Sequence, residues 1–486
     1  MIEESVKIHD KFSLEIKLGF HARKKKEISE FACNTWFFIP NSLDINAATY
    51  QKADFYRDIK SNIRLITPLF LLRDIADRNI PPFSLLEQSF QEMASSPLRS
   101  KIAAYEYQIR MFLSILKSSL RNEINHILAN KVPADTSYLI ATFVENCEKI
   151  SANYRSLRRV INVPTVSEEV MNYYFFGDEF ISNLFEQHTF RFISDLAKAY
   201  LSDEVSVHQL RNLINREIEY KKENGYPIFL KNKTKHNREL FFRLGLLKKY
   251  AENELFLQVD KKRDGVLAEQ VYFSLAAGLS MIFATAVAFS FQQHYGNLTM
   301  PLFVSLVISY MLKDRIKELA RYYFAHKLGR RYFDRKTDIR LNENDIGWSK
   351  EAMDFIPESK VPFEAMKLRA RSAILEANNR NNTEKIILYR KLLSLNRKNL
   401  DKGSRFSTAG VNEIIRISFI GFSPKMDDPV VPLFLPDTTK ETEILKVEKI
   451  YYVNLILQLK CDDQFEYKRY RISINRKGIR EVESFA

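Results

Sequence analysis

The sequence predicts an α+β membrane protein: an N-terminal β-hairpin and an α-helical bundle, a two-helix transmembrane hairpin, and a mainly antiparallel β region toward the C-terminus. Three observations support this fold class. Residues 270–312 contain no Lys, Arg, Asp or Glu, although 28% of the chain is charged. Apolar residues alternate with polar ones near both ends of the chain, as in half-buried strands. Between these regions, tracts with helical spacing follow one another and are separated by prolines.

The overall composition is that of a globular protein with a membrane anchor. A chain of 486 residues can form two or three domains, and a hydrophobic fraction of 45% excludes both a disordered chain and a polytopic transporter. Cys33, Cys147 and Cys461 form no CxxC motif, so we expect free thiols in a reducing compartment. The first residues contain no apolar core typical of a cleaved signal peptide, and insertion is expected to depend on internal spans.

The uncharged stretch, 271–312, is predicted to cross the bilayer twice. Residues 271–291 would form a helix about 31 Å long, which matches the apolar core of a bilayer. Residues 298–312 would give only about 22 Å, so taken alone they also fit a buried core helix or a re-entrant segment. Charge favours a second span, because basic residues lie on both flanks and none lies in the connecting loop. We therefore predict a multi-pass protein of a bacterial inner membrane with both terminal regions in the cytoplasm, the endoplasmic reticulum being the alternative membrane.

Small residues recur along both spans at intervals of four. They are Ala276, Ser280, Ala284, Ala288, Ser305 and Ser309. Such a stripe lets two helices approach closely in lipid, where packing rather than the hydrophobic effect drives association. The stripe predicts packing of the two spans on each other within one chain, and homo-oligomerisation through the same face is the alternative. Because the spans carry no ionisable group, an ion or proton path through them is not expected.

A basic juxtamembrane helix, 313–340, is predicted to follow the second span. Its candidate contacts with anionic lipid are Lys313, Arg315, Lys317, Arg321, Lys327, Arg330 and Arg331. Each such charge near an anionic membrane surface contributes about 1 kcal/mol of attraction. The alternative is that these residues serve only as the signal that orients the spans.

The remaining chain is divided into four predicted regions. Residues 1–48 are expected to form a β-hairpin, with strands around 12–20 and 31–39. Residues 49–234 are expected to form an α-helical cytoplasmic domain, and 235–270 a continuous helical stalk leading into the first span. In the C-terminal domain, 341–486, residues 341–410 are charged and loosely helical, and strands follow. The N- and C-terminal strands could join in one sheet or form separate domains.

Within the predicted α-helical cytoplasmic domain, the helical tracts are 50–78, 97–130, 136–162, 166–201 and 206–224.

The sequence contains no motif that predicts chemistry. Phosphate-binding glycine loops, zinc motifs, nucleophile elbows and EF-hand loops are absent, so no catalytic, cofactor-binding or metal-binding residue is predicted. The cluster of Asp54, Arg57 and Asp58 within 50–59 fits a ligand site, but a salt-bridged helix face is the simpler interpretation. The Asp427–Asp428 and Asp462–Asp463 pairs lie in turn-like contexts.

These observations favour a non-enzymatic membrane-anchored scaffold, adaptor or sensor with unknown protein partners. The first alternative is a membrane-surface enzyme whose site is scattered in sequence. The second is a membrane effector that responds to a nucleic acid or a ligand. Nucleic-acid binding is disfavoured because no recognisable binding fold accompanies the positive charge.

Overall fold

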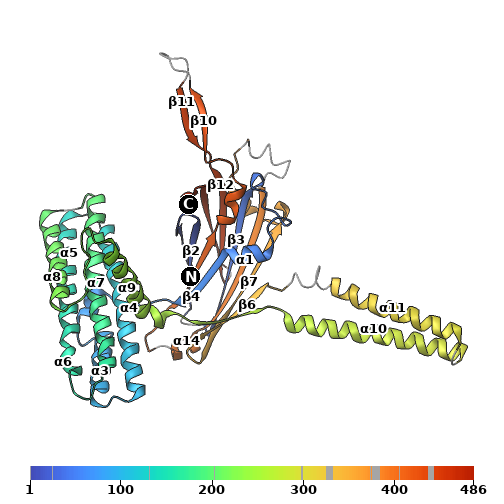
Figure 1. Cartoon of the computed structure of the whole chain (residues 1–486), viewed down its shortest axis with the longest axis horizontal. Coiled ribbons are helices and arrows are strands. Elements are labelled where there is room, and N and C mark those ends of the chain that lie inside the picture. The colour runs from blue at the N-terminus through green and yellow to red at the C-terminus, as the bar shows by residue number, and fades with distance from the viewer. Residues whose placement is uncertain are drawn as a thin grey trace. The chain divides into compact units, whose positions relative to one another are not determined.

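The computed structural model describes most of the chain and divides it into two compact units (Figure 1). The sheet unit comprises Met1–Ile63, Gln258–Arg405 and Gly410–Ala486, and the helical unit comprises Arg64–Leu257 and Phe406–Ala409. The α+β class is confirmed, with N-terminal strands, many helices and a C-terminal antiparallel sheet. The residues that are not described are Met1, Lys24, Lys25, Lys131, Ser202, Asn297, Leu298, 324–331, Ala373, 375–383, Ser404, 436–442, Asp463 and Ala486.

An eight-stranded antiparallel sheet forms the larger layer of the sheet unit. Its strand order is β14-β13-β12-β3-β8-β7-β6-β5. In that order the strands span Gly478–Phe485, Gln464–Asn475, Tyr451–Cys461, Ile28–Pro40, Glu384–Asn396, Asn344–Ile356, Arg335–Leu341 and Gln258–Arg263. The N-terminal β3 therefore lies between two strands from the C-terminal part of the chain.

A four-stranded sheet covers one face of β3. Its order is β1-β2-β9-β4, spanning Ile2–Ile8, Ser13–His21, Gly410–Ser418 and Ile59–Leu65. The Phe20 ring of β2 lies 5.4 Å from the Phe31 ring of β3, centroid to centroid. On the opposite face of β3, Trp36 and Phe38 pack against Ala365 of α12, which spans Phe363–Arg369. Burial on both faces explains why the end of β3 is a nearly continuous apolar run.

Shorter elements complete the sheet unit. They are α1 (Lys52–Asp58), α14 (Arg397–Gly403) and a two-stranded ribbon of β10 (Val430–Leu435) and β11 (Glu443–Glu448). The short helical turns lie at Asn41–Leu43, Asn253–Leu255, Glu358–Lys360 and Ile420–Lys425, the second of them belonging to the helical unit.

The helical unit is a bundle whose longer helices begin and end close to the predicted boundaries. It comprises α2 (Leu72–Ala76), α3 (Phe83–Ser95), α4 (Arg99–Ala129), α5 (Pro133–Ser156), α6 (Arg158–Ile161), α7 (Glu168–Lys198), α8 (Glu204–Glu223) and α9 (Thr234–Glu252). Local signals set these starts: Ser167 and Asp203 accept hydrogen bonds from the first turns of α7 and α8, and Pro133 occupies the first turn of α5. Residues 49–234 are not wholly helical, however, because β4 lies within them.

The predicted β-hairpin of 1–48 is wrong in its pairing. The two strands exist, but β2 pairs with β1 and β9, whereas β3 pairs with β12 and β8. Alternation identifies a strand and the face it buries, but not its partner. Of the two alternatives for the terminal strands, the structure shows that N- and C-terminal strands join in the same sheets.

Three other predictions are corrected along the second half of the chain. The continuous stalk of 235–270 is wrong, because α9 ends at Glu252 and β5 precedes the apolar helix. The basic helix of 313–340 is too long, because helix ends at Tyr323 in the described residues and β6 begins at Arg335. Residues 341–410 are not loosely helical, since β7 and β8 are central strands there. Their many charged side chains conceal the alternation.

The uncharged stretch forms two adjacent helices of the sheet unit, α10 (Val266–Tyr295) and α11 (Met300–Tyr323). Figure 1 shows them as a pair, coloured yellow-green and yellow. Among the described helices, α10 alone is long and apolar enough to cross a membrane by length and composition. The second half of α11 contains several charged residues, so that helix is less apolar than α10.

Candidate functional site

The α10–α11 hairpin is inserted between two paired strands. β5 and β6 are antiparallel neighbours, in register from Gln258 opposite Arg340 to Arg263 opposite Arg335. α10 begins at Val266, just after β5, and its start follows Gly265, whose positive φ of 73° suits glycine. The Asp264 carboxylate accepts the backbone N–H of Phe333 at 3.2 Å, which ties the exit of β5 to the entry of β6. The hairpin therefore leaves and re-enters the sheet at one end of the β5–β6 ribbon.

The small-residue stripe lies where α10 and α11 meet. Five of its members are buried: Ala276, Ser280, Ala284, Ser305 and Ser309. Ala288 is half-buried. The Ser309 hydroxyl donates to the backbone oxygen of Ala284 at 3.2 Å, across the two helices. Ser280 and Ser305 instead donate to carbonyls one turn back in their own helices, so their hydroxyls are satisfied.

The outer surface of the hairpin is apolar and exposed. The large side chains that point away from the stripe include Leu275, Leu279, Ile282, Phe289, Phe303 and Met311, each more than 60% exposed. Many large exposed apolar side chains close together are rare on a soluble protein and are typical of a protein–protein or membrane interaction site.

Ala284→Leu is expected to weaken the α10–α11 packing by about 1–3 kcal/mol, because the larger side chain must enter a buried contact beside Ser309. Ala286 lies on the exposed side of the same helix, so Ala286→Leu is the matched control. Hydrogen exchange of the α10 and α11 amides, measured by mass spectrometry in nanodiscs, would compare the two variants. Equal exchange in both would contradict a packing role for the stripe.

The basic residues predicted to contact lipid are described only in part. Lys313, Arg315, Lys317 and Arg321 lie on the last turns of α11, whereas Lys327, Arg330 and Arg331 lie outside the described residues. The Lys313 ammonium lies 4.1 Å from the centre of the Tyr310 ring, and the Arg321 guanidinium 5.7 Å from that of Phe273. Aromatic and basic side chains thus accompany each other at this end of the hairpin, an arrangement typical of a bilayer interface.

A polar pocket of about 270 Å³ lies at the root of the hairpin. Its lining residues are Lys52, Ala53, Tyr56, Arg263, Asp264, Gly265, Glu269, Tyr332, Phe333, Asp334 and Arg335. Asp334 accepts from the Lys52 ammonium at 2.7 Å and from the Tyr56 hydroxyl at 2.9 Å. Burial, reinforced by the charge of Asp334, raises the pKa of Tyr56, which therefore remains a hydroxyl donor. The pocket is thus lined by basic side chains and by the Asp334 carboxylate, to which the Tyr56 hydroxyl is donated.

The cluster that the sequence singles out, 50–59, overlaps this pocket, but its charged residues Asp54, Arg57 and Asp58 do not line it. In the 50–59 cluster, Arg57 bridges Asp54 at 3.0 Å and Tyr50 donates to Asp58 at 2.9 Å, as the salt-bridge interpretation expected. The residues that line the pocket are instead their neighbours Lys52 and Tyr56, whose shared partner Asp334 lies 278 positions from Tyr56. A separation of that size leaves no local signal.

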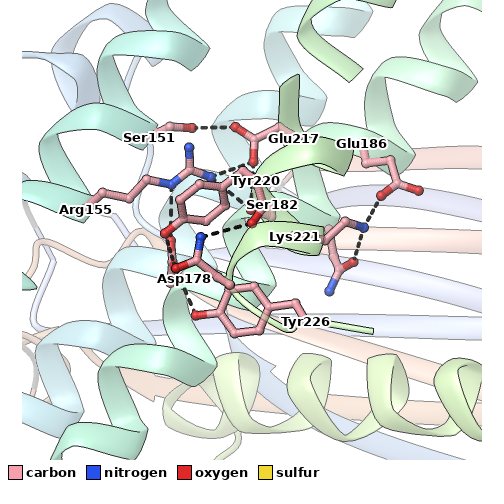
Figure 2. Close-up of polar contacts among 11 residues, drawn as sticks. Ser151, Arg155, Asp178, Ser182, Glu186, Glu217, Tyr220, Lys221 and Tyr226 are labelled. Atoms are coloured by element: carbon pink, nitrogen blue, oxygen red, sulfur yellow. Dashed lines mark hydrogen bonds and ion pairs between the residues drawn. The ribbon is translucent and has the colours of Figure 1, made fainter. Parts of the chain in front are cut away.

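A second polar cluster lies inside the helical unit, where Figure 2 shows charged side chains of α5, α7 and α8 converging. Arg155 of α5 donates to Glu217 of α8 at 2.6 Å and to Ser182 of α7 at 3.0 Å. Its guanidinium also lies 3.4 Å from the centre of the Tyr220 ring. Asp178 accepts from the Tyr220 and Tyr226 hydroxyls at 2.7 and 3.0 Å. We call this group, with Ser151, the ion network.

A fully buried ion pair lies beside the ion network. The Lys221 ammonium of α8, 1% exposed, donates to the Glu186 carboxylate of α7 and to the Asn183 side-chain oxygen, the latter at 3.1 Å. Asp178, Ser182 and Glu186 recur every four residues along α7, as Glu217 and Lys221 do along α8. That polar stripe on otherwise apolar helix faces is the signal by which the sequence could have revealed both clusters.

Burial sets the protonation states within the ion network. Burial raises the pKa of Asp178, although hydrogen bonds from Tyr220 and the charge of Arg155 oppose the shift. For Arg155, burial disfavours the charged guanidinium, but attraction to Glu217 outweighs it and the pKa rises. Arg155 therefore carries a fixed positive charge at the centre of three helices, and its carboxylate partners come from the other two.

The helical unit is expected to lose stability in mild acid through His188. Burial and the neighbouring cations Lys117, Arg191 and Arg121 lower the pKa of His188 from 6.5 to about 4. Below pH 6.5 the unfolded chain takes up a proton that the folded chain does not, so the free energy of unfolding falls as the pH falls from 6.5 toward 4. We expect a loss of about 2 kcal/mol between pH 7 and pH 5. His188→Gln should remove this part of the pH dependence, as measured by hydrogen exchange of the α7 amides; an unchanged pH dependence would refute the assignment.

No metal or catalytic centre was predicted, and the described residues contain no group of three or more His, Cys, Asp or Glu side chains arranged to hold a metal ion. Cys33 and Cys147 are buried, and burial raises the pKa of Cys33 to about 12. Both thiols are therefore protonated at neutral pH. No family model, curated protein or solved structure matches the chain.

Proposed function

We propose that the chain is a membrane-anchored scaffold, adaptor or sensor of a bacterial inner membrane, held by the α10–α11 hairpin as two spans with its folded units in the cytoplasm. The observation that carries the proposal is the position of the hairpin between β5 and β6. β5 and β6 pair with each other, so the two ends of the hairpin lie close together. If the hairpin crosses a membrane, both ends therefore lie on the same side of it. Its apolar outer surface suits lipid, and its small-residue stripe suits close helix packing there.

The second span is short, and the structure offers support for its insertion. The helix of α11 continues from Met300 to Tyr323, so its apolar part is extended by residues such as Lys313 whose long side chains can reach the head groups. Lys313, Arg315, Lys317 and Arg321 would then lie at the cytoplasmic interface and attract anionic lipid. With Ser309 bonded to Ala284 of the same chain, the stripe supports packing within one hairpin over homo-oligomerisation.

Accessible cysteines test this topology in cells. In a Cys461→Ser background, Tyr295→Cys at the turn of the hairpin should react with a membrane-impermeant maleimide from the periplasmic side of intact cells. Tyr138→Cys and Tyr452→Cys, both on exposed positions of the folded units, should react only after the membrane is permeabilised. Extraction with alkaline carbonate should leave the protein in the membrane pellet. Release by carbonate, or labelling of position 452 in intact cells, would overturn the two-span proposal.

The polar pocket at the root of the hairpin favours a ligand-responsive effector as the second candidate function. The pocket is lined by residues that lead into α10 and out toward β6, so a polar ligand bound there would contact both ends of the hairpin. If the chain is a sensor of this kind, Tyr56→Phe, which removes one donor to Asp334, should weaken ligand-induced protection of the α10 start against hydrogen exchange. Protection that is the same in both proteins would argue against the pocket.

A further inference from the structure

The outward face of α9 carries unpartnered aromatic side chains. Phe241 and Phe242 are 74% and 68% exposed, and Leu246, one turn further along the helix, is 48% exposed. The opposite side of α9 packs into the helical unit through Leu240, Leu247 and Ala251. A helix that is already held on one side by its own core does not need apolar residues on the other, so this face is available to a partner.

The chain segment that precedes α9 is fixed against the first turn of the helix. The Asn237 side chain both accepts from the backbone N–H of Leu230, at 3.0 Å, and donates to the backbone oxygen of the same residue, at 2.8 Å. The His236 ring lies within hydrogen-bond distance of the Ile228 oxygen, at 2.9 Å. These contacts hold Phe229, which is 40% exposed, next to the start of α9. We call Phe229, Phe241, Phe242 and Leu246 the α9 apolar face.

The surroundings of this face are strongly basic. Between Tyr226 and Tyr250 the sequence has seven basic residues against the single acid Glu239. Of these, Arg243 is engaged with the buried Glu179, by bonds of 2.8 and 2.6 Å. The others are exposed: Lys231, Lys233, Lys235, Arg238, Lys248 and Lys249. Six exposed basic residues thus lie in the same segment as the exposed aromatic residues, and Glu239 is the one acidic residue of that segment.

We propose that the α9 apolar face and the lysines around it bind the surface of an anionic bilayer, docking the helical unit on the membrane. Exposed Phe and Leu side chains among Lys and Arg are the pattern of a helix that lies in the interface plane, with aromatic residues at the acyl boundary and cations at the head groups. α9 ends at Glu252, and α10, the proposed anchor, begins at Val266, so only a short segment of chain separates the α9 apolar face from the anchor in sequence. This inference rests on the proposed anchoring by the hairpin, and adds a second, reversible contact to it.

Spin labels on the full chain test the inference. In a Cys461→Ser background, Phe242→Cys is labelled on the α9 apolar face and Tyr138→Cys, 73% exposed on α5, serves as the matched control. Each protein is reconstituted in vesicles of phosphatidylcholine with phosphatidylglycerol and in vesicles of phosphatidylcholine alone. Collision of the label with dissolved oxygen, which concentrates in lipid, is compared with collision with a water-soluble nickel chelate.

We expect the oxygen-to-nickel ratio at position 242 to exceed that at position 138 several-fold in the phosphatidylglycerol vesicles, and the difference to shrink in phosphatidylcholine. The triple variant Lys231→Gln, Lys233→Gln, Lys235→Gln should lose most of the difference, whereas Lys149→Gln, Lys198→Gln, Arg211→Gln elsewhere on the helical unit should keep it. Equal ratios at positions 242 and 138 would overturn the inference. Shielding of position 242 from both reagents in either lipid would also overturn it, since it indicates cover by protein.

Different results would refute the proposed hairpin anchor and the proposed α9 contact with the membrane. Release of the protein by alkaline carbonate would refute the hairpin anchor, whatever the spin labels report. A protein that stays in the membrane while its label at position 242 remains open to the nickel chelate would keep the anchor and refute only the α9 contact.

Discussion

Replacement of Lys221 by methionine is expected to destabilise the helical unit by about 3–5 kcal/mol. Lys221 is buried between α7 and α8, and its ammonium neutralises the buried Glu186 carboxylate. Methionine fills a similar volume but leaves that carboxylate without its counter-charge, and burial of an uncompensated charge is far more costly than the loss of a single hydrogen bond. Hydrogen exchange of the α7 and α8 amides at neutral pH would measure the change.

The double variant Lys221→Met, Glu186→Leu separates charge from packing. It removes both ions together, so it should recover most of the lost stability. The single and double variants share the same change at position 221, and any difference between them therefore reports the stranded carboxylate. A double variant as unstable as the single one would show that the lysine side chain acts through its packing instead.

Local sequence signals explain why the boundaries of the long helices in the helical unit could be predicted. Pro133, Ser167 and Asp203 stand where the structure starts three long helices, and each acts on its own first turn. The same logic applies to the small-residue stripe, whose spacing is a property of each helix alone and whose residues come together between α10 and α11. The membrane role of that stripe stays a prediction.

Long-range pairing accounts for what was missed. Alternation predicted β3, but its neighbours β12 and β8 come from the other end of the chain, and the partner of β5 is separated from it by the whole α10–α11 hairpin. The charged sequence of 341–410 predicts loose helix where the structure has β7 and β8, in which the charged residues Glu351 and Lys391 are buried at positions that would usually be apolar. Their charges are paired inside the sheet unit, a fact that no local pattern carries.

Replacement of Lys391 by methionine is the second change expected to have a large effect, about 3–5 kcal/mol on the sheet unit. The Lys391 ammonium of β8 pairs with Glu413 of β9, and its distance to the Glu351 carboxylate of β7 is 3.8 Å. Glu413 has no exposed surface, and Tyr389 donates to Glu351 at 2.6 Å. Without Lys391, the buried Glu413 carboxylate would lose its counter-charge and keep the Ser61 hydroxyl, while Glu351 would keep the Tyr389 hydroxyl and the Arg335 guanidinium, which lies 3.9 Å away.

Glu413→Gln is the matched control for that change. It removes one carboxylate and leaves Lys391 near Glu351, so the charge of the pair stays balanced and the cost should be clearly smaller than that of Lys391→Met. A larger cost for Glu413→Gln would mean that the Glu413 hydrogen bonds, such as the one from Ser61, outweigh charge balance in this core.

The two lysine variants together test the division of the chain. In sequence, most of the helical unit lies between Ile63 and Gln258 of the sheet unit, and each unit has its own buried core. Lys391→Met should therefore raise hydrogen exchange in β8 and β9 while α7 and α8 stay protected, and Lys221→Met should do the reverse. Because β5 and β6 belong to the same sheet as β8, only Lys391→Met should also loosen the root of the hairpin. If either variant raises exchange equally in both units, the two units unfold as one cooperative body.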